Sequence, residues 1–508
     1  MPHERSTGMT LAALQKAGLE GRIRGVPDQI VTGVQHDSRH VEPGDLFVAV
    51  PGQNHDGIGF VDDALARGAA AVMAERILER DVAQITVARA RVGLAVAAEL
   101  LYGSPTRTLR TVGITGTNGK TTTAYLLKHA IEADGGKVAF IGTTGLVVGD
   151  VERPALHTTP EADDISRFAA SSLEAGATHL VLEVSSHGLA LHRVDALQFE
   201  VAAFTNLSRD HLDFHRDLAS YGEAKARLFT ELSPKHSVIC IDDSFGAALA
   251  GRVRGPVIRC SLHARSRADV VAKEWSATRD GIRARVETPV GPVELASPML
   301  GRHNLENLLV ALGCAIALEL NIERVVTGWQ TANGSPGRLE RIQHPGEVAV
   351  LVDYAHTSDA LQRVLDTMRP LTPGRLIVVF GAGGDRDRGK RPEMGRVGAE
   401  HADLCVLTSD NPRTEDPQSI LAEIEVGARL GGAQRVEPGE LGRAKSGYCL
   451  TLNRRDAIRA AISAAQPGDT VLLAGKGHET YQIIGSERLV FDDREEARAA
   501  IAAKWGGG

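Results

Sequence analysis

A glycine-rich turn that leads directly into Lys120 and Thr121 indicates phosphate-binding chemistry. The turn follows a short apolar run and precedes a helical pattern. Glycine lets a backbone approach phosphate closely, and the amides that begin a helix point at an anion. Lys120 would reach the terminal phosphates, and the Thr121 hydroxyl would bind Mg²⁺. We expect an ATP site formed by Gly116, Thr117, Asn118, Gly119, Lys120, Thr121 and Thr122.

The turn departs at one position from the general phosphate-loop pattern. That pattern has a glycine five residues before Gly119, whereas this chain has Ile114 there. An ordinary strand-to-helix turn that happens to contain Gly-Lys-Thr is therefore the alternative. The strand predicted before the turn and the helix predicted after it favour the phosphate loop.

Two ionisable residues lie in apolar stretches, where a charge is costly unless it is paired or binds a metal. Glu183 interrupts the apolar run Leu180–Val184, and we expect it to bind Mg²⁺ rather than to form a salt bridge. Lys225 falls on the apolar stripe of a predicted helix; such a lysine usually extends to solvent or finds a carboxylate. A carbamate formed with CO₂ is the alternative, which periodicity alone supports little. The other members of the stripe are Leu218, Tyr221, Leu228 and Phe229.

Polar segments elsewhere leave two interpretations open. Residues 208–215 alternate His and Asp, which suits either a metal site or a hydrogen-bonded loop. Asn304 and Asn307 share one face of a predicted helix, where they would contact a nucleotide or cap the helix. Three polar turns before residue 60 are either surface loops or a site for a ligand with hydroxyl and phosphate groups.

Four predicted strands in the last third of the chain also run into polar loops. The loops begin at Asp353, Gly381, Asp410 and Gly475. Since parallel strands end at one edge of a sheet, we expect the loops to converge there. Two arginines and one glutamate in them suit a ligand with both carboxylate and ammonium groups. The glycines at 381–384 lack the spacing of a dinucleotide site.

The elements that must position these residues are strands alternating with helices, which indicates an α/β fold with mostly parallel sheets. We predict three domains: a small α/β domain over 1–105, a P-loop ATPase over 106–337 and a Rossmann-like domain over 338–508. Residues 431–446 should be a surface excursion. The predicted strands are Val31–Val34, Leu46–Val50, Ala69–Met73, Val112–Thr115, Val138–Ile141, His179–Val184, Val201–Phe204, Ser237–Ile241, Val348–Val352, Leu376–Phe380, Leu404–Thr408 and Val471–Ala474, with a helix over Phe60–Gly68.

Composition excludes several classes of protein. A net charge of -7 without a basic stripe argues against a nucleic-acid partner. The five cysteines lack metal or redox spacing, so we expect core residues in a reducing compartment. We find no apolar signal region and no membrane-spanning stretch, and we expect a cytoplasmic, monomeric protein without a membrane partner.

Several ordered blocks together resemble the Mur ligase family along nearly the whole chain. The Asp410-Asn411-Pro412-Arg413 loop is similar to that of the members that add meso-diaminopimelate. The resemblance implies an ATP-dependent amide bond in peptidoglycan precursor synthesis. In this family the carboxylate of a UDP-N-acetylmuramoyl dipeptide becomes an acyl phosphate, which the amine of diaminopimelate attacks. The blocks are GTNGKTT at 116–122, EVSSHG at 183–188, TNLSRDHLDFH at 205–215, YGEAK at 221–225, GRHNLEN at 301–307 and VDYAHT at 352–357.

The resemblance also implies roles for single residues. Lys120, Lys225 and His211 would be catalytic, with a CO₂-derived carbamate on Lys225, and Thr121, Glu183 and Lys225 would bind Mg²⁺. ATP would also be held by His303, Asn304, Asn307, Arg338 and Asp353. The UDP-sugar peptide would be held by Ser38, Gln53, Asn54, His55, Thr158, Thr159, Ser185 and Arg193. Diaminopimelate would be held by Arg386, Asp410, Asn411, Pro412, Arg413, Gly475 and Glu479.

The chain departs from the family pattern at two positions, and other functions compete with the one that the resemblance implies. His36 stands where relatives often carry Leu, and Leu191 stands where they often carry Gln. A lysine-adding ligase and a folylpolyglutamate synthase-like enzyme are the rival enzymes; the polar turns of the first domain argue against the latter. From another class, a nucleotide-gated switch protein would leave Lys225 and the loops of the third domain unexplained.

Overall fold

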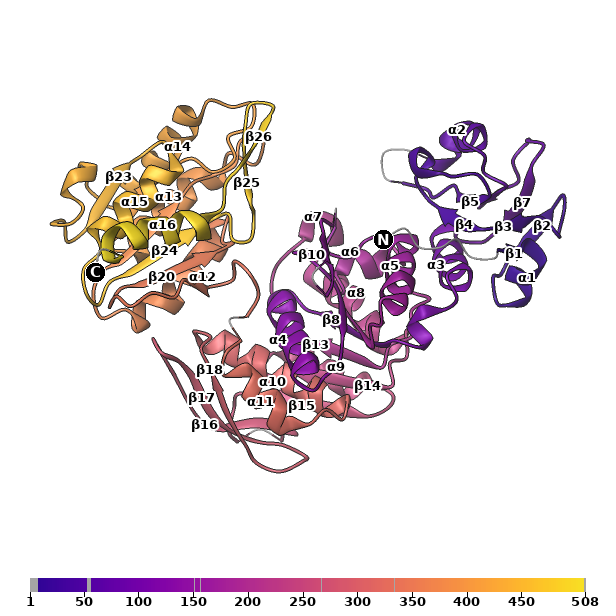
Figure 1. Ribbon diagram of the computed structural model, residues 1–508, viewed down its shortest axis with the longest axis horizontal. Helices are drawn as coiled ribbons and strands as arrows, with labels where there is room; N and C mark the ends of the chain where they lie inside the picture. The colour runs from indigo at the N-terminus through magenta and orange to yellow at the C-terminus, as the bar shows by residue number, and fades with distance from the viewer. Residues whose placement is uncertain are drawn as a thin grey trace. The chain divides into compact units, whose positions relative to one another are not determined.

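The computed structural model describes residues 8–52, 56–149, 151–155, 157–265, 267–332 and 334–506. In these ranges the strands form sheets of five, eleven and six strands and two small two-stranded sheets (Figure 1). The chain divides into two compact units. One comprises Met1–Glu274, Ala284–Leu295 and Leu305–Gln330, and the other comprises Trp275–Arg283, Ala296–Asn304 and Thr331–Gly508. The predicted α/β class is confirmed, and the three domain ranges stay a prediction.

The five-stranded sheet is built by the beginning of the chain, in the order β2-β7-β6-β5-β4. Strands β4 to β7 are parallel and β2 is antiparallel to β7. The strands are β2 Arg22–Arg24, β4 Gly33–Gln35, β5 Asp45–Val48, β6 Ala71–Ala74 and β7 Ala83–Thr86, and β1 Met9–Thr10 pairs with β3 Ile30–Val31. The helices are α1 Leu11–Lys16, η1 Ser38–His40, η2 Gly57–Phe60, α2 Val61–Ala66 and α3 Ala90–Leu101.

The eleven-stranded sheet has the order β11-β10-β9-β12-β8-β13-β14-β15-β16-β17-β18. Its strands from β9 to β16 in this order are parallel. The strands are β8 Arg110–Thr115, β9 Val138–Gly142, β10 Gly145–Val148, β11 Val151–Arg153, β12 His179–Glu183, β13 Val201–Phe204, β14 His236–Cys240, β15 Val257–Ser261, β16 Val270–Thr278, β17 Gly281–Glu287 and β18 Val293–Ser297. The helices are η3 Pro105–Arg107, α4 Lys120–Ala133, α5 Ala162–Glu174, α6 Ser186–Ala190, α7 Leu212–His215, α8 Leu218–Thr230, α9 Ser244–Arg252, α10 Arg302–Ala317 and α11 Ile322–Trp329.

The six-stranded sheet has the order β19-β20-β24-β21-β22-β23, parallel except for β19. The strands are β19 Glu340–Arg341, β20 Ala349–Asp353, β21 Leu376–Phe380, β22 Leu404–Leu407, β23 Gly447–Leu450 and β24 Thr470–Ala474, and β25 Tyr481–Ile484 pairs with β26 Glu487–Val490. The helices are α12 Ser358–Met368, η4 Arg369–Leu371, α13 Lys390–His401, α14 Pro417–Leu430, η5 Pro438–Glu440, α15 Arg454–Ala464 and α16 Asp493–Trp505.

Most predicted strands are present within a residue or two, because strands buried on both faces read as apolar runs. The predicted strand Val31–Val34 is wrong as one element: Thr32 donates to Gly44 O and separates β3 from β4. Leu218 is also wrong as a buried residue, since it is 43% exposed at the first position of α8. All five cysteines are buried and free, as expected.

Candidate active site

The glycine-rich turn links β8 to α4 at the centre of the eleven-stranded sheet (Figure 1). Gly119 precedes the first residue of α4 with φ +85°, and Gly116 has φ +150°. A Cβ at Gly116 would lie 1.9 Å from Thr205 Oγ1, so only glycine fits. Asn206 holds the turn from the side: its carbonyl accepts from Thr117 N at 2.8 Å and its Oδ1 from Asn118 N at 3.0 Å. The turn is therefore fixed against the loop that follows β13.

Lys120 folds back over this turn. Its Nζ donates to Gly116 O and Thr117 O, each at 2.9 Å. The ammonium group therefore lies beside the amides that begin α4. A helix start combined with a lysine is a favourable place for an anion such as a phosphate.

Glu183, the last residue of β12, is fully buried. Its Oε2 accepts from Thr121 Oγ1 at 2.8 Å and from Thr143 Oγ1 at 3.2 Å, and its Oε1 accepts from Thr143 N at 2.9 Å. These donors are neutral, and among the described residues no cation forms an ion pair with Glu183. The salt-bridge alternative thus has no support, whereas a buried carboxylate beside a threonine hydroxyl suits a divalent cation.

Lys225 lies on the buried face of α8 and is 1% exposed. Its Nζ donates to Gly116 O at 2.8 Å and lies 4.4 Å from the centre of the Tyr221 ring. Burial, and after it the charge of Lys120, holds the pKa of Lys225 well below its ordinary value. Lys225 therefore neither reaches solvent nor meets a carboxylate within ion-pair distance in the described structure. A low pKa favours the free amine, which is the form that reacts with CO₂.

His211 lies in the loop before α7 and belongs to a cluster of aromatic rings. Its backbone has φ +51°, and its half-exposed imidazole Nε2 lies 3.5 Å from Asp210 Oδ2. The ring centre lies 5.0 Å from that of His187 and 6.1 Å from that of Tyr221. Tyr221 therefore lies near both predicted catalytic residues, His211 and Lys225.

Four residues predicted to bind the UDP-sugar peptide lie together beside Glu183. Thr159 Oγ1 donates to Glu183 O at 2.8 Å and accepts from Ser185 N at 2.9 Å. Arg193 Nη1 donates to Thr159 O at 2.8 Å. Thr158 Oγ1 lies 3.2 Å from Thr143 Oγ1. Sequence reasoning missed Thr143, which links these residues to the predicted metal site.

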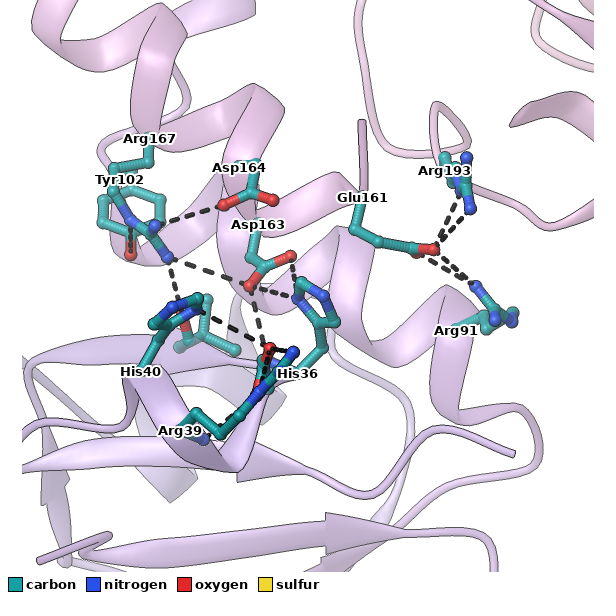
Figure 2. A network of polar contacts seen from close by, with 12 residues as sticks. His36, Arg39, His40, Arg91, Tyr102, Glu161, Asp163, Asp164, Arg167 and Arg193 are labelled. Atoms are coloured by element: carbon teal, nitrogen blue, oxygen red, sulfur yellow. Dashed lines mark hydrogen bonds and ion pairs between the residues drawn. The ribbon is translucent and has the colours of Figure 1, made fainter. Parts of the chain in front are cut away.

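A polar network joins the beginning of the chain to α5 (Figure 2). His36 Nδ1 lies 2.9 Å from Asp163 Oδ2, and Glu161 forms ion pairs with Arg91 at 3.0 Å and Arg193 at 2.7 Å. Burial lowers the pKa of His36, but the hydrogen bond to Asp163 and its charge outweigh burial and raise the pKa to about 9. His36 therefore carries a positive charge at neutral pH. 

Ser38, the predicted UDP contact, follows this histidine as the first residue of η1. It is buried, and Asp37 caps the short helix through Arg39 N. The predicted contacts Gln53, Asn54 and His55 lie outside the described residues.

The residues predicted to contact the nucleotide are found in both units. Asn307 is close to the turn, since a Cβ at Gly119 would lie 2.2 Å from Asn307 Oδ1. Burial lowers the pKa of His303 to about 4, and Asn304 Nδ2 donates to Leu300 O at 2.8 Å. Asn304 thus binds a backbone carbonyl of the preceding loop.

Arg338 and Asp353 lie in the second unit. The Arg338 guanidinium lies 5.0 Å from the centre of the Tyr354 ring. The Asp353 carboxylate accepts from Leu339 N and Ala355 N, each at 2.8 Å. Burial raises the pKa of Asp353, while the charge of Arg338 opposes that rise.

The loops that carry the predicted amino-acid contacts lie at one edge of the six-stranded sheet. Asn411 Nδ2 donates to Glu479 Oε2 at 2.9 Å. A Cβ at Gly383 would lie 3.0 Å from Arg413 Nη1 and 3.8 Å from Arg386 Cγ, so both arginines flank that glycine. The loops after β21, β22 and β24, which carry Arg386, Arg413 and Glu479, therefore meet at one edge of the sheet.

Gly475 and Asp410, which are also predicted to hold the amino acid, lie close to each other. Gly475 has φ +116°, and a Cβ there would lie 2.7 Å from Asp410 Oδ2. Burial would raise the pKa of Asp410, but the charges of Lys476 and Arg454 hold it below its ordinary value. Sequence reasoning missed Lys476, although its place between two glycines just before Glu479 was a signal.

Comparisons with known proteins match this arrangement. Models described as "Mur ligase family, catalytic domain", "Mur ligase middle domain" and "Mur ligase, glutamate ligase domain" match residues 30–101, 114–315 and 337–477. The UDP-N-acetylmuramoyl-L-alanyl-D-glutamate–2,6-diaminopimelate ligase of Geobacter metallireducens is 46% identical over 93% of this chain and 94% of its own. This chain belongs to the Mur ligase family. The ligase of the same name from Gloeobacter violaceus is 42% identical to this Mur ligase over 97% of each chain.

Solved structures agree with this membership. A structure of a UDP-N-acetylmuramoyl-L-alanyl-D-glutamate–2,6-diaminopimelate ligase, 34% identical, covers 98% of this Mur ligase and 99% of its own chain with a TM-score of 0.73. A folylpolyglutamate synthase of Mycobacterium tuberculosis, 21% identical, covers 76% of this chain with a TM-score of 0.58 and shares the fold. In the described ranges, no helix has the length and apolar character needed to cross a bilayer.

Proposed function

We propose that this Mur ligase adds meso-2,6-diaminopimelate to UDP-N-acetylmuramoyl-L-alanyl-D-glutamate, with ATP, in peptidoglycan precursor synthesis. The observation that carries the proposal is that the loops bearing Arg386, Arg413 and Glu479 follow the parallel strands β21, β22 and β24 at one edge of the six-stranded sheet. Arginine binds carboxylates through paired hydrogen bonds, and a glutamate binds an ammonium group. An amino acid with two carboxylates and a second amine fits this set. Relatives named for this reaction match over more than nine-tenths of the chain.

The chemistry requires that a carboxylate be activated, because a carboxylate is a poor acylating agent. Its attack on the γ-phosphate of ATP forms an acyl phosphate and releases ADP. The amine of the amino acid then attacks the acyl carbon, the amide bond forms and phosphate leaves. Lys120 and the amides that begin α4 would stabilise the charge of the phosphate during the first step.

The residues fit a divalent cation and a carbamate. Glu183 is a fully buried carboxylate whose hydrogen-bond donors among the described residues are neutral, and Thr121 Oγ1 donates to its Oε2. Thr121, Glu183 and a carbamylated Lys225 would hold Mg²⁺, which neutralises phosphate charge when bound. Carbamate formation joins the neutral Lys225 amine to the carbon of CO₂ and releases one proton. The lowered pKa of Lys225 favours that reaction.

The UDP-sugar peptide would be bound by the first unit. Thr159, Ser185 and Arg193 form one hydrogen-bonded group with the last residue of β12. Their hydroxyl and guanidinium groups suit the peptide carboxylate and the sugar. Ser38 and residues 53–55 would bind the uridine diphosphate. We expect the enzyme to act as a monomer in the cytoplasm, where ATP and the precursor are present.

An amino-acid panel tests the proposal. Purified protein is given ATP, Mg²⁺ and the UDP-dipeptide with diaminopimelate, lysine or ornithine, and phosphate release is measured. We expect release that depends on both the UDP-dipeptide and diaminopimelate. A preference for lysine would favour the lysine-adding ligase, and release without either substrate would favour a nucleotide switch.

A further inference from the structure

Lys476 is a fully buried lysine in the loop after β24. It lies between Gly475 and Gly477, which have φ +116° and +53°. These conformations favour glycine, so the chain can turn sharply on both sides of the lysine. The side chain is thereby directed inward, and a buried ammonium group requires several acceptors.

The acceptors of Lys476 include residues predicted to bind the amino acid. Its Nζ donates to Tyr481 O at 2.8 Å and to Asn411 Oδ1 at 3.1 Å. It lies 3.5 Å from Asp410 Oδ1 and 3.6 Å from Glu479 Oε2. One ammonium group thus contacts both carboxylates and the amide of the site.

These contacts fix the orientation of the Asn411 amide. Its Oδ1 accepts from Lys476 Nζ and from Ile483 N at 2.9 Å. Its Nδ2 must therefore face Glu479, to which it donates at 2.9 Å. A reversed amide would direct NH₂ hydrogens at an ammonium group and a backbone N–H, which is unfavourable. The second Nδ2 hydrogen can donate to a ligand carboxylate.

The charges explain why this position holds a lysine. Asp410 and Glu479 contribute two negative charges, and Lys476 neutralises one of them. One net negative charge then remains for an incoming ammonium group. Burial raises the pKa of Glu479, and the charge of Lys476 is the largest influence that opposes this rise. Without the lysine, the buried Asp410 and the partly buried Glu479 carboxylates would lose the cation that contacts both, and one would take up a proton.

We propose that Lys476 is a positioning residue of the amino-acid site, which orients the Asn411 amide and keeps Glu479 ionised to bind the distal ammonium group of the substrate. This inference rests on the proposed function. Lys476 acts through its two neighbours and need not touch the substrate. The charged and titratable groups that interact directly with Glu479 are Asp410, Lys476, Arg454, Tyr354 and Tyr481. Arg454 is itself ion-paired with Asp493, and Asp410 also interacts with His356 and Lys390.

The test compares the full-length wild type with Lys476→Met, which keeps the length of the side chain and removes its charge. We expect the KM for diaminopimelate to rise about 10- to 100-fold near pH 7, as for the loss of a charged hydrogen bond. The KM for ATP and for the UDP-dipeptide should stay within about twofold, since the residues proposed to bind them do not include Lys476 or its neighbours Asn411 and Glu479. The ratio of variant to wild-type KM should fall as the pH is raised, because Glu479 then ionises without the lysine.

Two variants serve as controls. Lys476→Arg keeps the charge and should show a smaller loss without the new pH dependence. Lys504→Met removes a lysine of the same unit whose Nζ donates to Ile462 O and Ser463 O, and it should leave all three KM values unchanged. If Lys476→Met is not recovered folded, as judged by circular dichroism, Lys476→Gln is measured in the same way.

The outcomes separate the inference from the function it rests on. An unchanged KM for diaminopimelate, or a loss of kcat that is equal at every pH, would overturn the role of Lys476 while the ligase activity stands. If wild-type enzyme rejects diaminopimelate and uses another diamino acid, the proposed substrate is wrong. The same KM and pH comparison with that amino acid then still decides the role of Lys476.

Discussion

The ion pair between His36 and Asp163 should make the stability of the protein depend on pH. The pKa of His36 is about 9 in the folded protein against an ordinary value of 6.5. That difference corresponds to ~3 kcal/mol of stabilisation by the linkage between protonation and folding. Since the side chain is 28% exposed, screening by solvent reduces this to roughly 1–3 kcal/mol.

The direction in which stability changes with pH follows from the raised pKa of His36. The stabilisation is fully present below about pH 6.5, where an unfolded histidine is also protonated, and is lost as the pH rises through about 9. His36→Gln should therefore lower the unfolding midpoint by roughly 1–4 °C at pH 6, because a unit of this size shifts by only about 1.5 °C per kcal/mol. The gap between wild type and variant should close near pH 9.5, which is about half a unit above the folded pKa.

Differential scanning calorimetry from pH 6 to about pH 9.5 measures this gap. His40→Gln is the matched control, because the His40 side chain is 71% exposed and lies 3.7 Å from its partner Asp37. Asp163→Asn should reproduce the loss, and the double variant with His36→Gln should lose little more than either alone. A gap that stays constant over this pH range would refute the ion-pair explanation.

Three other perturbations address the active site. Lys225→Ala should abolish turnover and be partly rescued by short carboxylates that replace a carbamate; unimpaired activity would exclude the carbamate. Arg413→Lys should raise the KM for the amino acid about 10-fold or more with little effect on the KM for ATP, since lysine cannot form paired hydrogen bonds; equal effects on both would contradict the assignment. Glu183→Gln should raise the Mg²⁺ concentration for half-maximal activity about 10-fold or more, and an unchanged Mg²⁺ requirement would contradict a metal role.

The sequence predicted the buried parallel strands well because such strands are apolar on both faces. Strands β17 and β18 were missed, since their residues alternate: β17 buries Ile282 and Ala284 but exposes Arg283. Strand β16 was missed because it buries only its first three residues. These strands do not form continuous apolar runs, which is the pattern that identified the buried parallel strands. The short strand β15 was missed for a similar reason, because Arg259 interrupts it.

The chemistry of the site was predictable where one local segment supplies it. The turn at 116–119 and Glu183 are examples, because a charge or a glycine stands out in an apolar stretch. Thr143 and Asn206 were not found, since their importance comes from partners far along the chain. The residue type of a threonine or an asparagine in a loop does not indicate which carboxylate or amide it will contact.

A single carbonyl, Gly116 O, accepts hydrogen bonds from both Lys120 and Lys225. An anion that moves Lys120 away from Gly116 O removes one hydrogen-bond donor from this oxygen and changes the electrostatic potential at the Lys225 amine. Occupancy of the glycine-rich turn and chemical modification of the α8 side chain are therefore thermodynamically coupled, and each must alter the other's equilibrium to the same extent.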